Sequence, residues 1–349
     1  MTKTSKRVIS IITVLFLILL LFSVITFYSI KNTRFSFEED DYIYVPVGAS
    51  LNSVIDNLES KFDLDVSYKI KIYTKFNSIE SSIKPGKHNL SNVVSISDLL
   101  KELTTNLNED IEIQIIEGLR VIDIAAQLAE NKELEDFESD RFIDLCSNQK
   151  FISQLVEDLD FYNVSSLEGF LFPDTYKINP SYNEEDIIKI LVSNFLTKIK
   201  PYHSDIKNRG MDTLMIVASI IEAETEVDTE MDTIASVYYN RIERGIPLQS
   251  DPTVLYYMDE EDLRKFKNSE PGAGKVWRYY KDTINSPYNT YKHMIPPTPI
   301  NSPGLSAIKA SIYPAVTDYI FMYSPSALSH HIFNTEENFD KHIKAYKND

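Results

Sequence analysis

The chain has 349 residues, 43% of them hydrophobic and 25% charged, and its formal net charge is −17. So high an apolar fraction excludes a disordered chain, and the length predicts about two domains. The acidic balance argues against a nucleic-acid-binding protein, which needs a basic surface for phosphates. A single cysteine, Cys146, excludes an intrachain disulfide and any metal site built from several cysteines.

An uncharged run of 23 residues extends from Val8 to Ile30. About 20 apolar residues at a rise of 1.5 Å cross the hydrocarbon layer, so a transmembrane helix is predicted over residues 8–30. A cleaved signal peptide is the alternative, but no small-residue cleavage site follows the run. Basic residues within residues 1–7 predict a cytoplasmic N-terminus. The protein would then cross the cytoplasmic (inner) membrane once, with the rest of the chain periplasmic or extracellular.

Residues 42–106 have the pattern of a small α+β module. In residues 42–58, alternating apolar residues predict a strand, a Pro-Val-Gly turn follows, and a helical apolar face completes the segment. Residues 67–76, SYKIKIYTKF, also alternate and are predicted as strand or mixed structure. The segment SISDLLKELTTN is predicted as a short helix capped by Ser95 or Ser97.

The rest of the chain divides into a connector over residues 107–164 and a C-terminal domain over residues 165–349. Within the connector, residues 111–131 repeat the strand–turn–helix order, and residues 131–160 are charged and helical by composition, as in a connector or a lid. The helices predicted in the C-terminal domain cover residues 183–200, 212–226 and 232–244. A region rich in Pro, Tyr and Asn follows, which is typical of ligand-binding loops on a scaffold.

The predicted helix over residues 212–226 is the most informative stretch. Its apolar residues cover nearly the whole circumference, so the helix should be largely buried. At about 100° per residue, Glu222 and Glu224 lie about 80° to either side of the main apolar face, so they cannot both point into one cleft. A carboxyl group packed against apolar atoms has a raised pKa, as a general acid near neutral pH requires. From the helix alone, the plainer interpretation is favoured, in which both glutamates are solvated at the helix end.

Three further stretches combine polar groups with aromatic residues. The segment LEGFLFPDTY, residues 167–176, fits a wall of a sugar-binding site or, more simply, a tight turn beside core aromatic residues. Residues 240–258 end a helix at Gly245 and continue as a polar loop, and residues 286–315 expose amides and hydroxyls. Both are also compatible with ordinary solvated connections. The sequence contains no phosphate-binding loop, GxSxG elbow or HExxH helix.

The histidines predict no metal site. His330 and His331 are adjacent, which is not the spacing of a helical ligand pair, and no second cluster supports them. Neither a metal nor another cofactor is therefore expected. A serine–histidine–aspartate arrangement is not indicated either, because the serine of the informative helix, Ser219, lies on its buried part.

Seven segments, taken in order, resemble the MltG (YceG-like) family of membrane-anchored endolytic murein transglycosylases. They are PVGASLNSVIDNL, IIEGLRVIDIAAQLA, LEGFLFPDTY, VASIIEAET, ASVYYNRIERGIPLQSDPTVLYYM, SPYNTYKHMIPPTPINSPGLSAIKAS and HIFNT. The resemblance implies an α+β fold. A single N-terminal transmembrane helix would precede a small LysM-like α+β module over residues 42–106 and a mixed α/β catalytic domain over residues 165–349 with a buried catalytic helix.

The same resemblance assigns roles to individual residues. It makes the first glutamate of VASIIEAET, Glu222, the catalytic acid and gives Glu224 a supporting role. Ala223 stands where family members often carry lysine. His331 matches the histidine of the family's C-terminal motif, in which Ser329 replaces a glycine. The residues expected to bind substrate are Glu168, Tyr176, Asn240, Gln249, Asp251, Thr253, Ser286, Tyr288, Asn289, Tyr291 and His331.

The activity implied by the resemblance is cleavage of the MurNAc–GlcNAc β-1,4 bond in nascent peptidoglycan strands without hydrolysis, which would terminate elongation. Glu222 would protonate the glycosidic oxygen and then accept the proton of the C6 hydroxyl, closing a 1,6-anhydro ring on MurNAc. The expected partners are peptidoglycan strands and the cytoplasmic membrane, with peptidoglycan synthases and the elongation or division machinery as candidates, and no nucleic acid. A hydrolytic muramidase and a non-catalytic wall-binding scaffold remain alternatives.

Overall fold

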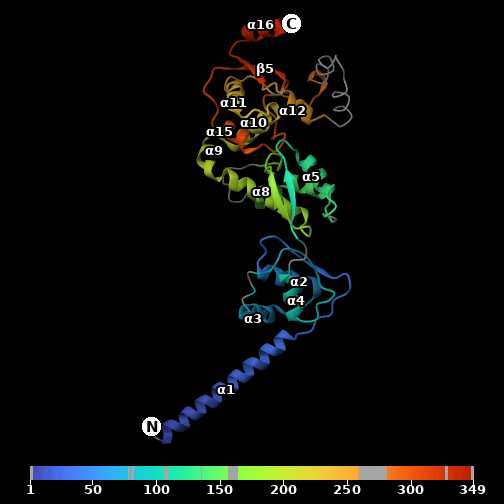
Figure 1. Ribbon diagram of the computed structural model, residues 1–349, viewed down its shortest axis with the longest axis vertical. Coiled ribbons are helices and arrows are strands. Elements are labelled where there is room, and N and C mark those ends of the chain that lie inside the picture. The colour runs from blue at the N-terminus through green and yellow to red at the C-terminus, as the bar shows by residue number, and fades with distance from the viewer. Residues whose placement is uncertain are drawn as a thin grey trace. The chain divides into compact units, whose positions relative to one another are not determined.

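The computed structural model describes residues 3–77, 79, 82–105, 109–134, 136–155, 164–258, 281–326 and 329–346. The chain forms two compact units (Figure 1). Unit 1 comprises Met1–Ile111 with Ile178–Asp186, and unit 2 comprises Glu112–Lys177 with Ile187–Asp349. Helices and three two-stranded sheets among the described residues make the fold mixed α+β, as predicted.

The first helix, α1, covers Lys3–Lys31, and its part Ile12–Lys31 is long and apolar enough to cross a membrane. Large apolar side chains from Ile12 to Tyr28 are exposed, an arrangement that is unfavourable in water and favourable in lipid. The helix predicted over residues 8–30 is therefore present, and it is consistent with a single-pass membrane anchor.

After α1, the described residues before Ile111 form a strand pair and three helices. The strands β1 Tyr42–Val45 and β2 Gly86–Asn89 pair antiparallel, and the helices are α2 Leu51–Phe62, α3 Ser67–Asn77 and α4 Ile96–Thr104. The hydroxyl of Ser95 caps α4 by accepting from the backbone N–H of Asp98 at 3.2 Å. The strand–turn–helix order over residues 42–58 and one of the two proposed caps are confirmed.

The prediction of strand or mixed structure for residues 67–76 is wrong, because this segment is the helix α3. Ile70, Tyr73 and Thr74 are spaced by three and four residues, and all three are buried in unit 1. Tyr68 and Ile72 remain exposed. Over so short a run, a period of two and a period of 3.6 residues fit the same letters, and only burial against the rest of the unit distinguishes them.

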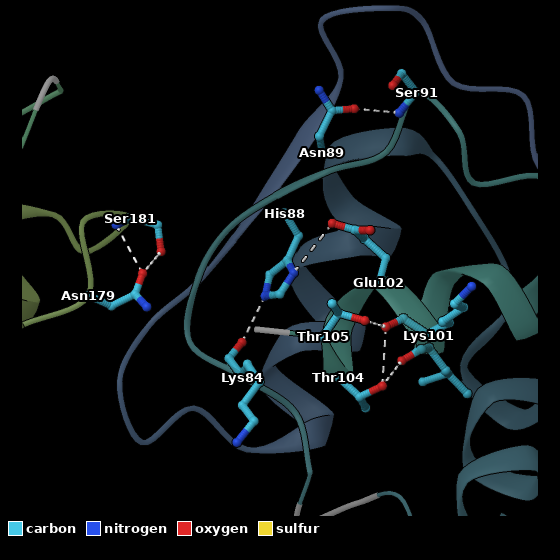
Figure 2. Close-up of polar contacts among 11 residues, drawn as sticks. Lys84, His88, Asn89, Ser91, Lys101, Glu102, Thr104, Thr105, Asn179 and Ser181 are labelled. Carbon is cyan, nitrogen blue, oxygen red and sulfur yellow. Dashed lines mark hydrogen bonds and ion pairs between the residues drawn. The ribbon is translucent and has the colours of Figure 1, made fainter. Parts of the chain in front are cut away.

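His88, on β2, joins three segments of unit 1 (Figure 2). Its ring is buried, and Nε2 donates to the backbone carbonyl of Lys84 at 2.8 Å, since a carbonyl oxygen can only accept. Nδ1 lies 3.8 Å from a carboxylate oxygen of Glu102 on α4, which is an electrostatic contact rather than a hydrogen bond. The ring therefore links β2 to the loop before it and to α4.

Replacing His88 with Ala should lower the free energy of unfolding of unit 1 by about 2–4 kcal/mol, because the Lys84 carbonyl loses its donor and a cavity opens. His88→Gln is the matched control, since its amide can still donate, and it should lose less than half as much. Denaturant unfolding of the full chain, monitored by amide hydrogen exchange in β2 and α4, measures the loss of stability in both variants. Equal losses in the two variants would contradict a role for the hydrogen bond.

The remaining elements mostly belong to unit 2. They are β3 Ile111–Ile115, α5 Val121–Ala129, α6 Ser139–Ser147, α7 Gln149–Leu155, β4 Asp174–Ile178, α8 Glu184–Ile199, a 3₁₀ turn Lys200–Tyr202, α9 His203–Arg209, α10 Met211–Glu224, α11 Asp228–Glu243, α12 Asp251–Tyr256, α15 Leu305–Ile312, β5 Phe321–Ser326, β6 Ser329–Phe333 and α16 Glu336–Tyr346. β3 pairs with β4, and β5 with β6. The strand–turn–helix order over residues 111–131 is confirmed.

At the centre of unit 2, α10 packs against α11 and α15 (Figure 1). Its residues from Leu214 to Ile221 are all buried, so the predicted burial of this helix is confirmed. Residues 251–256 are a helix rather than the predicted polar loop, because Pro252 in the first turn has a φ that suits a helix start. Within residues 131–160, α6 and α7 confirm the helical character, and residues 135 and 156–160 lie outside the described residues.

Candidate active site

The last turn of α10 carries both glutamates, and the helix ends there because Thr225 is extended, with φ −146° and ψ 142°. Glu222 contacts the start of α15, whereas Glu224 contacts α11 and the residue before α12. The two carboxyl groups therefore have separate surroundings, in agreement with the helical-wheel prediction.

A pocket of about 290 Å³ adjoins Glu224. Its lining residues are Glu224, Val237, Tyr238, Arg241, Leu248, Gln249, Asp251, Tyr291, Met322, Tyr323 and His330. Among the residues predicted from the sequence, the pocket brings together Glu224, Gln249, Asp251 and Tyr291. The predicted acid, Glu222, is not among its lining residues.

The carboxyl group of Glu224 accepts two hydrogen bonds on one oxygen. The hydroxyls of Tyr238 and Ser250 donate to Oε1 at 2.6 and 2.8 Å. Burial raises the pKa of Glu224, the two hydroxyl donors lower it, and the net direction is upward. The described residues form no hydrogen bond to Oε2, so this second oxygen can carry a proton and transfer it.

Arg241 fixes the wall of the pocket from α11. Its guanidinium is buried, and Nε donates to the carbonyl of Ile320 at 2.6 Å. One terminal nitrogen donates to the carbonyls of Pro247 and Leu248 at 3.0 and 2.8 Å, and to Oε1 of Gln249 at 3.2 Å. A single side chain therefore holds the loop before α12 and the start of β5 against α11.

Gln249 has a left-handed backbone with φ of 52°, which costs about 1–2 kcal/mol for a residue with a Cβ. Its N–H donates to the carbonyl of Thr290 at 3.1 Å, and its side chain accepts from Arg241. These contacts offset the strain and hold the amide at the pocket. Strained non-glycine residues of this kind concentrate at functional sites.

Asp251 and Tyr291 meet at the edge of the pocket. The Tyr291 hydroxyl donates to the carboxylate of Asp251, and the ammonium of Lys281 lies 4.5 Å from the centre of the Tyr291 ring. Burial raises the pKa of Tyr291, so its phenol stays neutral and keeps its proton for donation. The pair supplies a carboxylate and a fixed aromatic ring beside Glu224.

The structure brings His330, rather than the predicted His331, to the pocket. Consecutive strand residues point to opposite sides, and His331 lies instead beside His342, with ring centres 4.5 Å apart. Nδ1 of His330 is 3.0 Å from a carboxylate oxygen of Glu230, and the side chain is 1% exposed. Its buried Nε2 has no hydrogen-bond partner among the described residues.

Glu222 has two acidic neighbours, Glu117 and Asp228. Its Oε2 accepts from the backbone N–H of Gly304 at 2.9 Å, directly before α15. Burial raises its pKa, the Gly304 bond lowers it, and the charges of Glu117 and Asp228 raise it. Gly304 leaves room for both glutamates, since a Cβ there would lie 2.8 Å from Cγ of Glu117 and 3.5 Å from Oε2 of Glu222.

Glu168 is buried between α5 and α12. The N–H of Val121 and the hydroxyl of Tyr256 each donate to its carboxyl group at 3.1 Å. Burial raises its pKa to about 7 despite these donors. The adjacent Gly169 has φ of 88°, and a Cβ there would lie 2.5 Å from the ring of Pro299, so the segment forms a tight turn.

Glu168→Gln should remove a pH dependence of stability. A raised folded-state pKa means that the group stabilises the fold fully below its usual pKa of 4.5, and that this contribution is lost as the pH rises through about 7. The variant should therefore be more stable than the wild type at pH 8, by about 3 kcal/mol, with the difference vanishing near pH 4.5. Unfolding free energies measured across this range test it, and a difference that does not change with pH would contradict it.

Two other predicted residues hold loops through their side chains. The amide of Asn240 donates to the carbonyls of Thr317 and Tyr319 at 3.0 and 2.9 Å. The hydroxyl of Thr253 is 2.8 Å from that of Thr290. Neither Asn240 nor Thr253 lines the pocket.

The last four predicted residues also make internal contacts. Ser286 Oγ accepts from the N–H of Tyr288 at 3.1 Å, and the Tyr288 hydroxyl is 2.7 Å from that of Thr298. The amide of Asn289 donates to two backbone carbonyls at 2.8 and 2.9 Å. Tyr176 is buried, and its hydroxyl donates to a carbonyl four residues earlier at 2.5 Å. None of these four lines the pocket.

Sequence reasoning missed four polar pocket residues: Tyr238, Arg241, Tyr323 and His330. A signal existed for the first two, because they are three residues apart on a predicted helix and so share a face. The choice between His330 and His331 depends on strand register, which the sequence does not give.

Comparison with known proteins decides the family. The sequence model of the YceG-like family matches residues 43–348. The chain belongs to the YceG-like family. It is 30% identical over 319 residues to the endolytic murein transglycosylase of Bacillus subtilis, covering 87% of this chain and 82% of that protein. It is 27% identical over 326 residues to a protein of the same name from Streptococcus pneumoniae, covering 87% of this chain and 58% of the relative.

A solved structure has the same fold. The crystal structure of a YceG-like protein from Listeria monocytogenes matches with a TM-score of 0.54 and 25% identity, covering 87% of this chain and 98% of that one. The YceG-like fold expected from the motifs is therefore confirmed.

Proposed function

We propose that the chain is a membrane-anchored endolytic murein transglycosylase. It would cleave MurNAc–GlcNAc β-1,4 bonds within nascent peptidoglycan strands and leave 1,6-anhydro-MurNAc ends. The observation that carries the proposal is the polar pocket beside Glu224, a buried carboxyl group with a raised pKa. Membership of a family whose relatives bear this enzyme name supplies the substrate class.

The acid in this proposal is Glu224, not the Glu222 that the sequence resemblance indicated. Both carboxyl groups have raised pKa values, so the pKa does not distinguish them. The position of the pocket favours Glu224, because Glu224 lines it together with other polar side chains. Glu222 accepts from the N–H of Gly304 and has the carboxylate of Glu117 as a neighbour, and it would serve a structural role.

One carboxyl group can serve both steps of the reaction. Glu224 gives its proton to the glycosidic oxygen as the bond to C1 of MurNAc breaks, which leaves a carboxylate and a cationic sugar. The hydroxyls of Tyr238 and Ser250 stabilise this carboxylate through Oε1. The carboxylate then accepts the proton of the C6 hydroxyl while O6 bonds to C1. The acid is restored and no water is consumed.

The other polar pocket residues would hold the sugar. Gln249, Asp251 and Tyr291 present an amide, a carboxylate and an aromatic ring, which suit hydroxyl groups, acetamido groups and a sugar face. His330 adds a ring nitrogen. Side chains of this chain alone would supply every step of this reaction.

The apolar helix α1 would span the cytoplasmic membrane once, with residues 1–7 inside the cell. Residues 42–106 would form a LysM-like module, residues 107–164 a connector and residues 165–349 the catalytic domain, all outside. An enzyme anchored there meets new strands as they are made, so we propose that it terminates strand elongation beside peptidoglycan synthases and the elongation or division machinery.

Mass spectrometry of the products from long uncrosslinked glycan strands tests the proposal, with the full chain in detergent micelles. Wild type and Glu222→Gln should yield internal fragments that end in 1,6-anhydro-MurNAc, and Glu224→Gln should not. Reducing MurNAc ends would indicate a hydrolytic muramidase instead. Intact strands that sediment with the protein would indicate a wall-binding scaffold, and loss of products in Glu222→Gln alone would return the acid to Glu222.

A further inference from the structure

The apolar helix α1 is attached to unit 1 without a free linker. The ring of Phe27 stacks on that of Tyr73 in α3, with centres 5.4 Å apart and planes within 8°. Ile30 and Phe35 are part of the buried core of unit 1. The last turns of α1 are therefore held by the folded unit.

A largely apolar groove of about 490 Å³ follows this contact. Ile72 of α3 forms one side, and residues of α1 between Leu20 and Ile30 form the other. Leu20 is eleven residues before Lys31, the end of the candidate span, which is about 16 Å along the helix axis. Phe27, which contacts Tyr73 of α3, lies inside the candidate span Ile12–Lys31, so α3 contacts α1 within its last apolar turns rather than beyond its end.

The outer face of α3 is amphipathic. Tyr68 and Ile72, one turn apart, are 57% and 38% exposed. Lys69, Lys71 and Lys75 flank them, and the opposite face of the helix is buried in unit 1. Exposed aromatic and aliphatic side chains bordered by lysines are the pattern of a helix that lies in a membrane interface.

The charge of this face is opposite to that of the whole chain. The protein carries a net −17, yet α3 has three lysines and no acidic residue over Ser67–Asn77. A partner for this face therefore combines an anionic group for the lysines with hydrocarbon for the groove. An anionic phospholipid has both, and the bilayer around α1 supplies it at this place.

We propose that the outer face of α3 and the adjoining groove bind anionic phospholipid of the bilayer that α1 spans. An acyl chain would occupy the groove, and phosphate groups would contact Lys69, Lys71 and Lys75. Unit 1 would then lie directly on the membrane surface. This inference rests on the membrane anchoring in the proposed function and is independent of the catalytic assignment.

The only native cysteine, Cys146, is buried, so one introduced cysteine can be labelled selectively. Three positions are compared in the full chain, each carrying a fluorophore: Ile72→Cys on α3, Leu19→Cys on α1 and Asp56→Cys on the exposed side of α2. The protein is reconstituted into vesicles of phosphatidylcholine and phosphatidylglycerol that contain a spin-labelled phospholipid quencher.

The labels at 72 and 19 should be quenched, and the label at 56 should not. Charge reversal at Lys69, Lys71 and Lys75 together should weaken the binding of α3 to the lipid surface at least about tenfold, since each lysine near an anionic surface contributes favourably to binding. Quenching at 72 should fall accordingly and quenching at 19 should stay. With the wild-type lysines, quenching at 72 should fall in the same way when the vesicles contain phosphatidylcholine alone.

Quenching at 19 with none at 72 would overturn this inference and leave the anchor intact. No quenching at either position would overturn the anchor and the inference together. If quenching at 72 changes neither with the charge reversal nor with the lipid headgroup, recognition of anionic phospholipid by α3 is excluded. Product formation by the same preparations reports separately on the catalytic proposal.

Discussion

Glu224→Gln is expected to lower the rate of strand cleavage about a thousandfold, the middle of the range for loss of a general acid. Glutamine has nearly the same shape and still accepts from Tyr238 and Ser250, so the pocket should persist. What it lacks is a transferable proton. The measurement is the initial rate of 1,6-anhydro end formation on uncrosslinked strands.

Glu222→Gln is the matched control, two residues earlier on the same helix, and its rate should stay within about tenfold of wild type. Strand binding by Glu224→Gln should be retained. The wild-type rate should fall as the pH rises through the pKa of Glu224, which burial raises from its ordinary value. A Glu224→Gln variant that is as active as wild type would refute the assignment.

Arg241→Leu is expected to lower the free energy of unfolding of unit 2 by about 3–5 kcal/mol. Four acceptors lose their donor at once: the carbonyls of Ile320, Pro247 and Leu248, and the side chain of Gln249. The left-handed backbone of Gln249 also loses a contact that offsets its strain. Denaturant unfolding of the full chain measures the loss.

Arg241→Lys separates the charge from the geometry. Lysine keeps the positive charge, but a single ammonium cannot reproduce the planar fork that reaches both β5 and the loop before α12. Its stability should lie between those of wild type and Arg241→Leu, and its cleavage rate should fall because the pocket wall moves. A lysine variant with wild-type stability and activity would show that the fork is dispensable.

Features with a strong local pattern could be predicted from the sequence. The apolar run of α1, the strand–turn–helix order of residues 42–58 and 111–131, and the burial of α10 each follow from the periodicity or length of apolar residues. The family also followed from the order of its motifs, as the match over residues 43–348 shows. The helix α3 was not predicted, because its short alternation fits a period of two as well as a period of 3.6 residues. The helix α12 was not predicted, because a proline after a polar loop also fits a turn.

At the candidate site, what the sequence determines is separated more sharply from what only the tertiary structure determines. The sequence by itself determined that Glu222 and Glu224 face different ways, because a helix of known pitch fixes the angle between them. Only the tertiary structure decided that the pocket, with Asp251, Tyr291 and His330, lies on the side of Glu224. Those residues come from segments far apart in the chain. Their meeting depends on long-range packing and on the register of β6, neither of which a local pattern encodes.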